Sequence, residues 1–430
     1  MKYQKIKGTN DFFNEEAIKY RYIEQVATEE SKKFGFSEVI TPIFEMTELF
    51  TRSVGEDSDI VNKEMYTFTD RGDRSITLRP EGTAVISRCL VENKLYANPG
   101  LLKQYYFGPM FRYERPQAGR LRQFTQFGIE AFGLENPLLD ADIINLAWII
   151  LKKLGLSKIK VLLNTIGSND SRKAYVEALK EYFAPQINTL CGDCQRRLVQ
   201  NPLRILDCKI DGKSELIKNA PTMESFLSDE DKQYFEEVQK ALRAFDIDFV
   251  VDTRLVRGLD YYSQTVFEIT YEDPASPINN IILGGGGRYN SLISELGGPN
   301  MPAIGFALGV ERLMMVIDEV DAWPDLFDQF SVVVITLGKE AKMEGLRLTN
   351  YLRTNGIKTE IDYQSNNLKP QFKLADRVKA RYLLILGEDE IKNDLITVKD
   401  NETGKQETIS VSELKTLLNI EGEKTYAYQK

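Results

Sequence analysis

The most distinctive chemical feature of the sequence is a short loop that is dense in arginine. Four arginines fall within eleven residues, at Arg112, Arg115, Arg120 and Arg122. Guanidinium groups form paired, charge-assisted hydrogen bonds with phosphate oxygens, so the loop indicates binding of a phosphate-bearing ligand. From these residues alone, an ordinary hairpin with a solvated basic loop is an equally good interpretation.

The stretch after this loop alternates with the two-residue period of a strand. One face carries polar groups beside an aromatic ring, at Phe124, Gln126, Gly128 and Glu130. The opposite face is mostly apolar and suits a packed core, with Thr125, Phe127 and Ile129. Burying an amide and a carboxylate is costly unless they are partnered, so the first face indicates that something polar is held there.

A further carboxylate lies where a helix is expected to begin. Pro80 and Glu81 open a helical stretch, and both residue types suit the first turn of a helix. The backbone N–H groups of that turn favour either a carboxylate or a ligand anion. A capping role and a ligand-binding role for Glu81 are therefore both open.

The chain contains no histidine among its 430 residues. Imidazole is thus excluded as a base, a metal ligand or a pH switch, and catalysis must use carboxylates, arginines, tyrosines, a bound metal or the substrate itself. Chance is a poor explanation for this absence. An advantage in making the protein when histidine is scarce and a deliberate removal by design are the two hypotheses.

The four cysteines offer only an incomplete set of metal ligands. Cys191 and Cys194 have a zinc-like spacing, and Cys208 could be a third ligand, but without histidine the fourth would have to be remote. We therefore expect reduced, unliganded thiols and no metal site, with structural zinc as the alternative.

Length and composition are those of a globular protein with two or three domains. Apolar residues make up 42% and charged residues 28% of the chain, and no apolar run is long enough to span a bilayer. With no apolar signal core at the start, a cytoplasmic location without a membrane partner is expected. The net charge of -9 argues against a wholly basic nucleic-acid binder but permits local basic patches.

Hydrophobic periodicity predicts the elements that must position these groups. In the first part of the chain, helices are expected at 14–34, 44–52, 80–93 and 139–154, and strands at 36–42, 65–70, 75–79, 161–164, 249–252, 265–271 and 281–289. A further strand that runs into a helix is expected at 303–313. The stretch from about 170 to 245 is charged and largely helical, and it interrupts the strand pattern. An acidic boundary near 318–328 then precedes strands at 331–337, 358–363 and 382–386 and helices at 340–355 and 368–379.

The predicted fold is thus an α+β domain followed by a small α/β domain. We expect residues 1–325 to form a mostly antiparallel sheet flanked by helices, with a helical insertion at about 170–245. Residues 330–425 should form an α/β domain with mainly parallel strands. Its second helix carries Lys369, Lys373 and Arg377 and could face nucleic acid, although a solvated helix face is the more common explanation.

Neither of the common nucleotide-binding motifs is present. There is no Gly-x-x-x-x-Gly-Lys-Ser/Thr, and no Gly-x-Gly-x-x-Gly follows a first strand. The sequence instead resembles the class II aminoacyl-tRNA synthetases in three successive motifs. These are a helix and strand ending at Pro42, Phe111-Arg-x-Glu114 with its loop and strand, and Gly309-x-Glu-Arg312 opening a helix.

Further stretches narrow the resemblance to the histidyl-tRNA synthetase family. They are Leu78-Arg-Pro-Glu-Gly-Thr83, Gln123-Phe-x-Gln-Phe-Gly-x-Glu130, Leu255-Val-Arg-Gly-Leu-Asp-Tyr-Tyr262 and Leu283-Gly-Gly-Gly-Gly-Arg-Tyr289. The resemblance covers nearly the whole chain. It implies that residues 330–425 bind the anticodon and that the enzyme is a homodimer with the Pro42 region at its interface.

The resemblance also implies a role for each site residue. Arg112 would contact the α-phosphate of ATP, with the other ATP contacts made by Glu114, Arg120, Phe124 and Arg312. Arg257 would hold the histidine carboxylate and act with Arg112 in catalysis. The ammonium group of histidine would be bound by Glu81, Thr83 and Gln126, and the imidazole by Glu130 and Tyr262.

The implied reaction needs no protein nucleophile. Histidine carboxylate attacks ATP to give histidyl-adenylate and pyrophosphate, and the histidyl group then passes to the 3′ end of histidine tRNA. Mg²⁺ on the phosphates assists, and positioning and electrostatics do the rest. Arg115 and Gln117 would contact the tRNA acceptor end.

Two positions depart from the family pattern, which often has histidine in place of Asn93 and Thr125. Alternation places Thr125 away from the substrate face, so its replacement is expected to be tolerated.

The competing interpretation is a non-catalytic paralogue, the synthetase-like regulatory subunit that partners ATP phosphoribosyltransferase in histidine biosynthesis. Such paralogues typically lack the anticodon domain and have degraded arginine motifs, whereas Arg112, Arg257 and Arg312 are all present here. A non-catalytic RNA-binding module would not explain the polar strand face.

Overall fold

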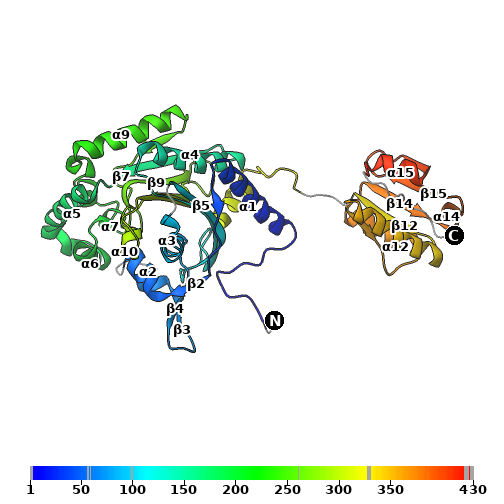
Figure 1. The fold of residues 1–430 in the computed structure, drawn as a ribbon, viewed down its shortest axis with the longest axis horizontal. Coiled ribbons are helices and arrows are strands. Elements are labelled where there is room, and N and C mark those ends of the chain that lie inside the picture. The colour runs from blue at the N-terminus through cyan, green and yellow to red at the C-terminus, as the bar shows by residue number, and fades with distance from the viewer. Residues whose placement is uncertain are drawn as a thin grey trace. The chain divides into compact units, whose positions relative to one another are not determined.

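The chain divides into two compact units, Met1–Leu326 and Phe327–Lys430. Both were obtained as a computed structural model, which describes residues 3–55, 58, 60–97, 100–259, 261–326, 331–420 and 426. Figure 1 shows the helices and strands of each unit. No helix in these ranges combines the length and the apolar content that a membrane span requires.

An eight-stranded sheet forms the centre of the first unit, in the order β1-β5-β6-β11-β10-β9-β7-β8. The strands are β1 (Ser37–Glu38), β5 (Leu102–Phe111), β6 (Gln123–Phe132), β7 (Ile159–Thr165), β8 (Phe249–Val251), β9 (Ser263–Tyr271), β10 (Ile281–Arg288) and β11 (Ala303–Gly309). Pairing is antiparallel except at the two edges, where β1 joins β5 and β8 joins β7 in parallel. The mostly antiparallel sheet expected from the sequence is confirmed.

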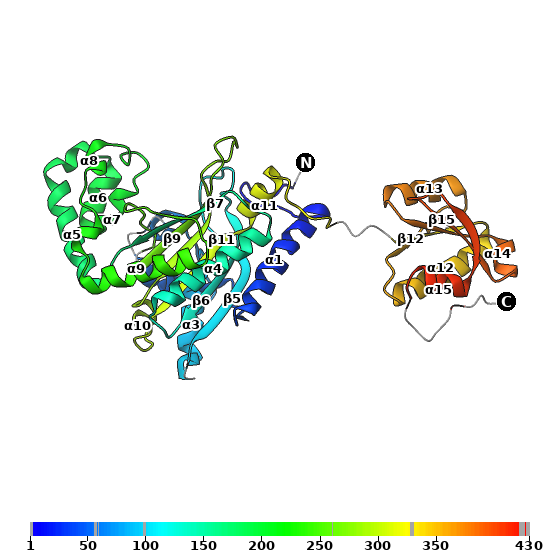
Figure 2. The same ribbon diagram turned by 90° about the horizontal axis from the view of Figure 1, so that it is seen from above.

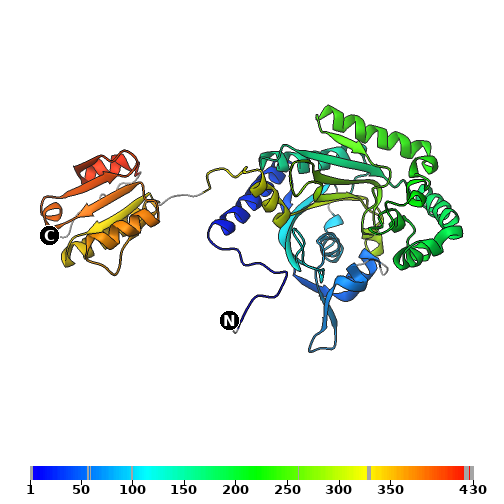
Figure 3. The same ribbon diagram turned by 180° about the vertical axis from the view of Figure 1, so that it is seen from behind.

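Helices pack on both faces of this sheet. The main core lies between one face and α1 (Glu15–Lys33), α4 (Pro137–Lys153), α9 (Asp229–Ala244) and α11 (Val310–Glu319). On the other face, within the curve of the sheet, lies α3 (Thr83–Glu92), accompanied by α2 (Thr47–Val54) and α10 (Leu292–Glu295) (Figures 1 and 3). Because β5 and β6 are long and strongly curved, α3 can approach the middle of the sheet, where the site residues lie.

A smaller sheet, β2-β4-β3, projects from the first unit. Its strands are β2 (Phe44–Met46), β3 (Tyr66–Thr69) and β4 (Ser75–Leu78). The helix expected at 44–52 is therefore wrong at its start, because residues 44–46 pair with β4 and only Thr47–Val54 is helical. The strand expected at 36–42 is reduced to β1. Beyond it, the carbonyls of Thr41 and Pro42 accept hydrogen bonds from Arg79 instead of joining the sheet.

Between β7 and β8 the chain is helical, as expected. The helices before α9 are α5 (Asn169–Phe183), α6 (Gly192–Gln200), α7 (Leu203–Leu206) and α8 (Glu215–Lys218). Short stretches of 3-10 or π helix occur here and elsewhere, at Ile60–Glu64, Leu95–Ala97, Ala184–Thr189 and Met223–Phe226. The α5–α8 segment has its own small core, whereas α9 contributes Val238 and Leu242 to the main core.

The second unit is a five-stranded sheet in the order β13-β12-β14-β15-β16. Its strands are β12 (Val332–Thr336), β13 (Thr359–Ile361), β14 (Tyr382–Leu386), β15 (Leu395–Asp400) and β16 (Gln406–Ser410), and its helices are α12 (Lys339–Thr354), α13 (Leu368–Arg377), α14 (Glu388–Lys392) and α15 (Val411–Leu417). Helix α13 covers one face, and α12 and α15 the other (Figure 2). The parallel pairing expected holds for the first three strands, while β15 and β16 extend the sheet antiparallel and were not anticipated.

Candidate active site

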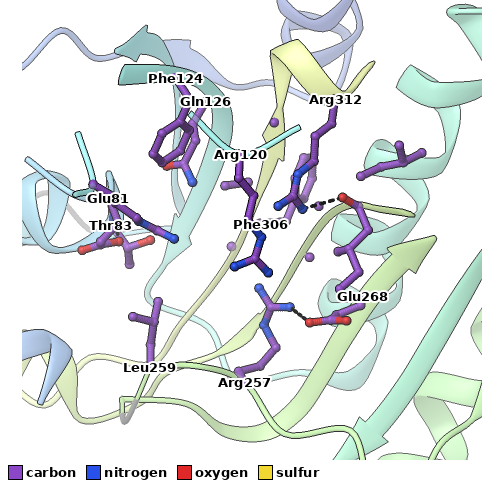
Figure 4. A pocket seen from close by; sticks show the side chains of 18 of the residues that line it. Glu81, Thr83, Arg120, Phe124, Gln126, Arg257, Leu259, Glu268, Phe306 and Arg312 are labelled. Carbon is purple, nitrogen blue, oxygen red and sulfur yellow. Dashed lines mark hydrogen bonds and ion pairs between the residues drawn. The ribbon is translucent and has the colours of Figure 1, made fainter. Parts of the chain in front are cut away.

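One pocket of the first unit gathers ten of the eleven residues predicted to bind ATP or histidine, and they come from four separate stretches of the chain. It lies over β6, β9, β10 and β11 and beside the start of α3 (Figure 4). The predicted residues that line it are Glu81, Thr83, Arg112, Glu114, Arg120, Phe124, Gln126, Arg257, Tyr262 and Arg312. The solvated-loop interpretation therefore fails for two of the four loop arginines, Arg112 and Arg120.

Three guanidinium groups enter one end of this pocket, each held by a backbone or carboxylate oxygen. Arg112 donates from Nε to the Pro80 carbonyl at 2.9 Å, and Arg120 pairs with Glu114 at 3.1 Å. Arg312 donates to the carbonyls of Gly119 at 2.8 Å and Ile282 at 2.7 Å. Burial, followed by the charge of the neighbouring arginines, lowers the pKa of Arg312. Crowding of fixed cations in a concave site favours a multiply charged anion.

An aromatic ring lies beside these arginines. The Arg112 guanidinium is 5.3 Å from the centre of the Phe124 ring, which also lines the pocket. A planar ligand stacked on Phe124 would thus have its charged part next to Arg112. Gln126, two residues along β6, faces the same pocket, whereas Thr125 is 5% exposed and accepts or donates a hydrogen bond with the Tyr20 hydroxyl at 3.1 Å. The alternation predicted for this strand is confirmed.

Glu81 caps helix α3 and lines the pocket at the same time. Its two carboxylate oxygens each accept a backbone hydrogen bond of 2.8 Å, from Thr83 and from Ala84. Burial raises the pKa of the Glu81 carboxyl against the effect of these bonds. Both roles left open by the sequence are therefore compatible with its position.

Glu130 lies beneath the pocket and is not among the side chains that line it. One of its oxygens accepts a hydrogen bond of 2.6 Å from the Thr83 hydroxyl, and the other accepts one from Tyr289. Burial raises the pKa of Glu130 to about 8. A Cβ atom on Gly305 would come within 2.0 Å of this carboxylate, so only glycine fits there. In this structure the Glu130 carboxylate is engaged by Thr83 and Tyr289, and its contact with the imidazole of histidine stays a prediction.

Arg257 is held by a carboxylate that the sequence prediction did not include. It pairs with Glu268 of β9, and the two side chains are 18% and 17% exposed (Figure 4). Its guanidinium carbon is 5.7 Å from the ring of Tyr262, which lines the pocket beside Tyr261. Gly285 leaves room for this arrangement, because a Cβ there would lie 2.8 Å from the Arg257 guanidinium. In the loop that carries Arg257, the structure describes the residues up to Leu259 and again from Tyr261. Asp260 lies outside the described residues.

Three tyrosines of the pocket were also missed. Tyr106 occupies the space left by two glycines, since a Cβ on Gly82 or Gly128 would lie 2.3 or 2.4 Å from its ring. Tyr261 and Tyr289 line the same wall. The sequence contained a signal for two of them. Tyr289 follows shortly after the four glycines of β10, and Gly128, on the polar face of β6, leaves the space that Tyr106 fills.

Two groups of predicted residues lie outside the pocket. Arg115 and Gln117 are exposed in the loop between β5 and β6, where the backbones of Gln117 and Arg120 bridge each other. In the second unit Lys369, Lys373 and Arg377 are exposed on α13.

Comparison with known proteins places this geometry in a family. A family model described as histidyl-tRNA synthetase matches residues 8–313, and one described as an anticodon binding domain matches residues 331–420. The chain belongs to the histidyl-tRNA synthetase family. Membership makes it an enzyme of the aminoacyl-tRNA synthetase class, with a C-terminal anticodon-binding α/β domain.

The relatives of this synthetase match over almost their full length. The chain is 50% identical over 413 residues to the histidine–tRNA ligase of Anoxybacillus flavithermus, covering 96% of this chain and 97% of that protein. It is 48% identical over 415 residues to the histidine–tRNA ligase of Bacillus subtilis, with the same coverage. The apo histidyl-tRNA synthetase of S. aureus has a TM-score of 0.84 and 41% identity, covering 96% of this chain and 99% of that one.

Proposed function

We propose that the chain charges histidine tRNA with L-histidine in two steps, both carried out in the pocket of the first unit. The observation that carries this proposal is the arrangement of three arginines and an aromatic ring at one end and buried carboxylates and tyrosines at the other. The first end suits a nucleoside triphosphate and the second a small ligand with an ammonium and an imidazole group. Family membership and the relatives at about half identity support histidine as the amino acid.

In the first step the carboxylate of histidine attacks the α-phosphorus of ATP. The new P–O bond forms as the bond to pyrophosphate breaks, and negative charge on the α-phosphate oxygens increases. Arg257, oriented by Glu268, holds the attacking carboxylate, and Arg112, oriented by the Pro80 carbonyl, neutralises the α-phosphate. Because both cations are positioned before the substrates arrive, little reorganisation is needed in the transition state.

The remaining contacts with ATP are made by residues at the arginine-rich end of the pocket. Phe124 stacks on adenine and Glu114 holds its edge while keeping its pair with Arg120. Arg120 reaches the terminal phosphates, and Arg312 covers the far side of the nucleotide.

Histidine is held at the other end. Glu81, Thr83 and Gln126 bind its ammonium group, and Tyr262 and Glu130 take the imidazole. A neutral imidazole has one donor and one acceptor nitrogen, and a carboxylate with a phenol can satisfy both. A ligand without these nitrogens would leave the buried partners unpaired, which makes the site selective.

Mg²⁺ enters this scheme with the ATP phosphates. The carboxylates that line the pocket are already engaged: Glu81 by backbone N–H groups, Glu114 by Arg120, Glu268 by Arg257 and Glu311 by the Thr125 N–H at 2.9 Å. They do not form a resident cage for a cation. Mg²⁺ commonly keeps several waters and binds through substrate phosphates, which matches a site of this kind.

In the second step the 3′-terminal ribose hydroxyl of the tRNA attacks the carbonyl carbon of the adenylate and releases AMP. Arg115 and Gln117, which are exposed, contact the acceptor end beside the pocket. Lys369, Lys373 and Arg377 offer a basic face of the anticodon-binding domain to the RNA backbone.

We further propose that the synthetase is a cytoplasmic homodimer. Apolar side chains around Pro42 are exposed in the single chain, among them Ile40 at 86% and Phe44 at 54%. An exposed apolar group of this size favours a protein interface.

Histidine-dependent exchange between ATP and labelled pyrophosphate tests the first step. Exchange should require histidine and should not occur with other amino acids. A folded sample with no exchange at saturating histidine would favour the regulatory-subunit alternative, whereas exchange without transfer to tRNA would place the defect in the second step.

A further inference from the structure

Four potential metal ligands meet in the α5–α8 segment, away from the active-site pocket. Cys191, Cys194, Cys208 and Asp211 each contribute one ligand atom, and these atoms all lie within 4.8 Å of one another. The sequence did not reveal the set, because the fourth ligand was expected to be remote. Asp211 lies three residues after Cys208, where the chain turns back.

Two of the distances within this cluster match a tetrahedral zinc site. With Zn–S bonds of about 2.3 Å and Zn–O bonds of about 2.0 Å, a tetrahedron has S–S edges of about 3.8 Å and S–O edges of about 3.5 Å. Cys191 Sγ is 3.7 Å from Cys208 Sγ, and Cys208 Sγ is 3.6 Å from Asp211 Oδ2. A disulfide needs sulfur atoms about 2 Å apart, so the thiols here have metal spacing and not disulfide spacing.

The backbone around the cluster is arranged as in a ligand shell. The N–H of Asp211 donates to Cys208 Sγ at 3.3 Å, and the N–H of Cys191 donates to Asp211 Oδ2 at 2.9 Å. Donors to the ligand atoms fix their direction and stabilise their negative charge when a metal is bound. The turn is tight, because a Cβ on Gly212 would lie 2.4 Å from the Cys208 carbonyl.

Two features of the segment that carries the cluster favour stabilisation by a bound metal. Its helices α7 and α8 have four residues each, which is far below the length at which a helix is stable by itself. Cys194 and Cys208 are buried in its small core with Leu190 and Ile205. Small cores of this kind are commonly stabilised by a disulfide or a structural metal.

We propose that Cys191, Cys194, Cys208 and Asp211 bind one Zn²⁺ ion as a closed structural site. On binding, three thiols lose their protons to solvent and Zn²⁺ takes up three thiolates and one carboxylate oxygen. The site joins the start of α6 to the end of α7. From α7, Arg204 donates at 2.7 Å to the carbonyl of Gly258, next to Arg257 in the pocket, so the metal also supports the loop that carries Arg257.

Zinc content and cysteine labelling test this proposal on the full chain. A protein without a polyhistidine tag is required, and since the chain has no histidine, no imidazole can contribute a background signal. After loading with Zn²⁺ and gel filtration, the wild type and Cys89→Ser should retain one zinc per chain. Cys89 lies outside the cluster and is the matched control. Cys194→Ser and Asp211→Asn should bind zinc at least about tenfold more weakly.

A second readout needs no variant and so does not depend on how the variants fold. Under native conditions an alkylating reagent should modify the partly exposed Cys89 while Cys191 is protected by zinc, and a chelator should abolish that protection. Retention of less than about a tenth of an equivalent of zinc by the wild type would overturn the proposal. So would equal alkylation of Cys191 with and without zinc, or a Cys191–Cys208 disulfide in protein prepared under reducing conditions.

Discussion

The pair formed by Arg257 and Glu268 allows the catalytic role of an arginine to be separated from its structural role. In Arg257→Ala, Glu268 would keep a carboxylate that is 17% exposed and has lost its paired cation. Removing one partner of a buried pair costs about 3–5 kcal/mol, and partial exposure reduces this to about 2–3 kcal/mol here. Burial already raises the pKa of Glu268 and Arg257 opposes that shift, so the carboxyl can also respond by protonation.

Removing the negative charge as well should reverse the instability but not the loss of activity. In the double variant Arg257→Ala/Glu268→Gln no charge is stranded, and we expect most of the lost free energy of unfolding to return. The cation proposed to hold the histidine carboxylate is still absent. Arginines that neutralise charge in phosphoryl transfer contribute roughly 10³- to 10⁵-fold, so exchange should stay reduced by that factor in both variants.

Two measurements on the wild type, the two single variants and the double variant test the role of Arg257. Histidine-dependent ATP–pyrophosphate exchange reports activity, and urea unfolding followed by tryptophan fluorescence reports the first unit, which contains both tryptophans of the chain. Glu268→Gln, which keeps the cation, should lose about tenfold in exchange at most. If the double variant recovers exchange to within tenfold of the wild type, Arg257 acts only through the fold and the proposed role is wrong.

Three further predictions concern other parts of the synthetase. Thr125→His should change the KM for histidine little, because residue 125 faces Tyr20 and not the pocket; a large improvement would contradict the face assignment. Since burial raises the pKa of Glu130 from 4.5 to about 8, the unfolded chain ionises first, and the free energy of unfolding without histidine should fall by about 3 kcal/mol between about pH 5 and 7.5. Glu130→Gln should remove that fall in urea titrations, and an unchanged slope would refute the assignment. Lys373→Ala/Arg377→Ala should raise the KM for tRNA roughly tenfold without altering exchange, whereas Lys392→Ala on α14 should alter neither.

Local sequence patterns were sufficient to predict much of the secondary structure of the first unit. The two-residue period of a strand separates Phe124 and Gln126 from Thr125 wherever β6 lies in the fold, because the separation depends only on backbone geometry. Helix α1 was equally readable, since its apolar spacing ends at Gly35, whose φ of 81° suits glycine. Prediction from local sequence failed where a neighbouring strand decides the conformation. Phe44–Met46 was expected to be helical but forms β2, because it pairs with β4.

The sequence by itself determined the family, the mostly antiparallel sheet and ten of the residues that line the pocket. These residues could be recognised because their side chains suit a phosphate and a polar ligand, and because each motif is contiguous in the chain. Only the tertiary structure decided their partners. Glu130 receives Tyr289 from 159 positions away, Arg257 is oriented by Glu268 on β9, and Asp211 joins three cysteines as a fourth potential ligand. Burial sets these pairings, because a charge removed from water takes whichever partner the fold brings within reach, however far away it lies in the chain.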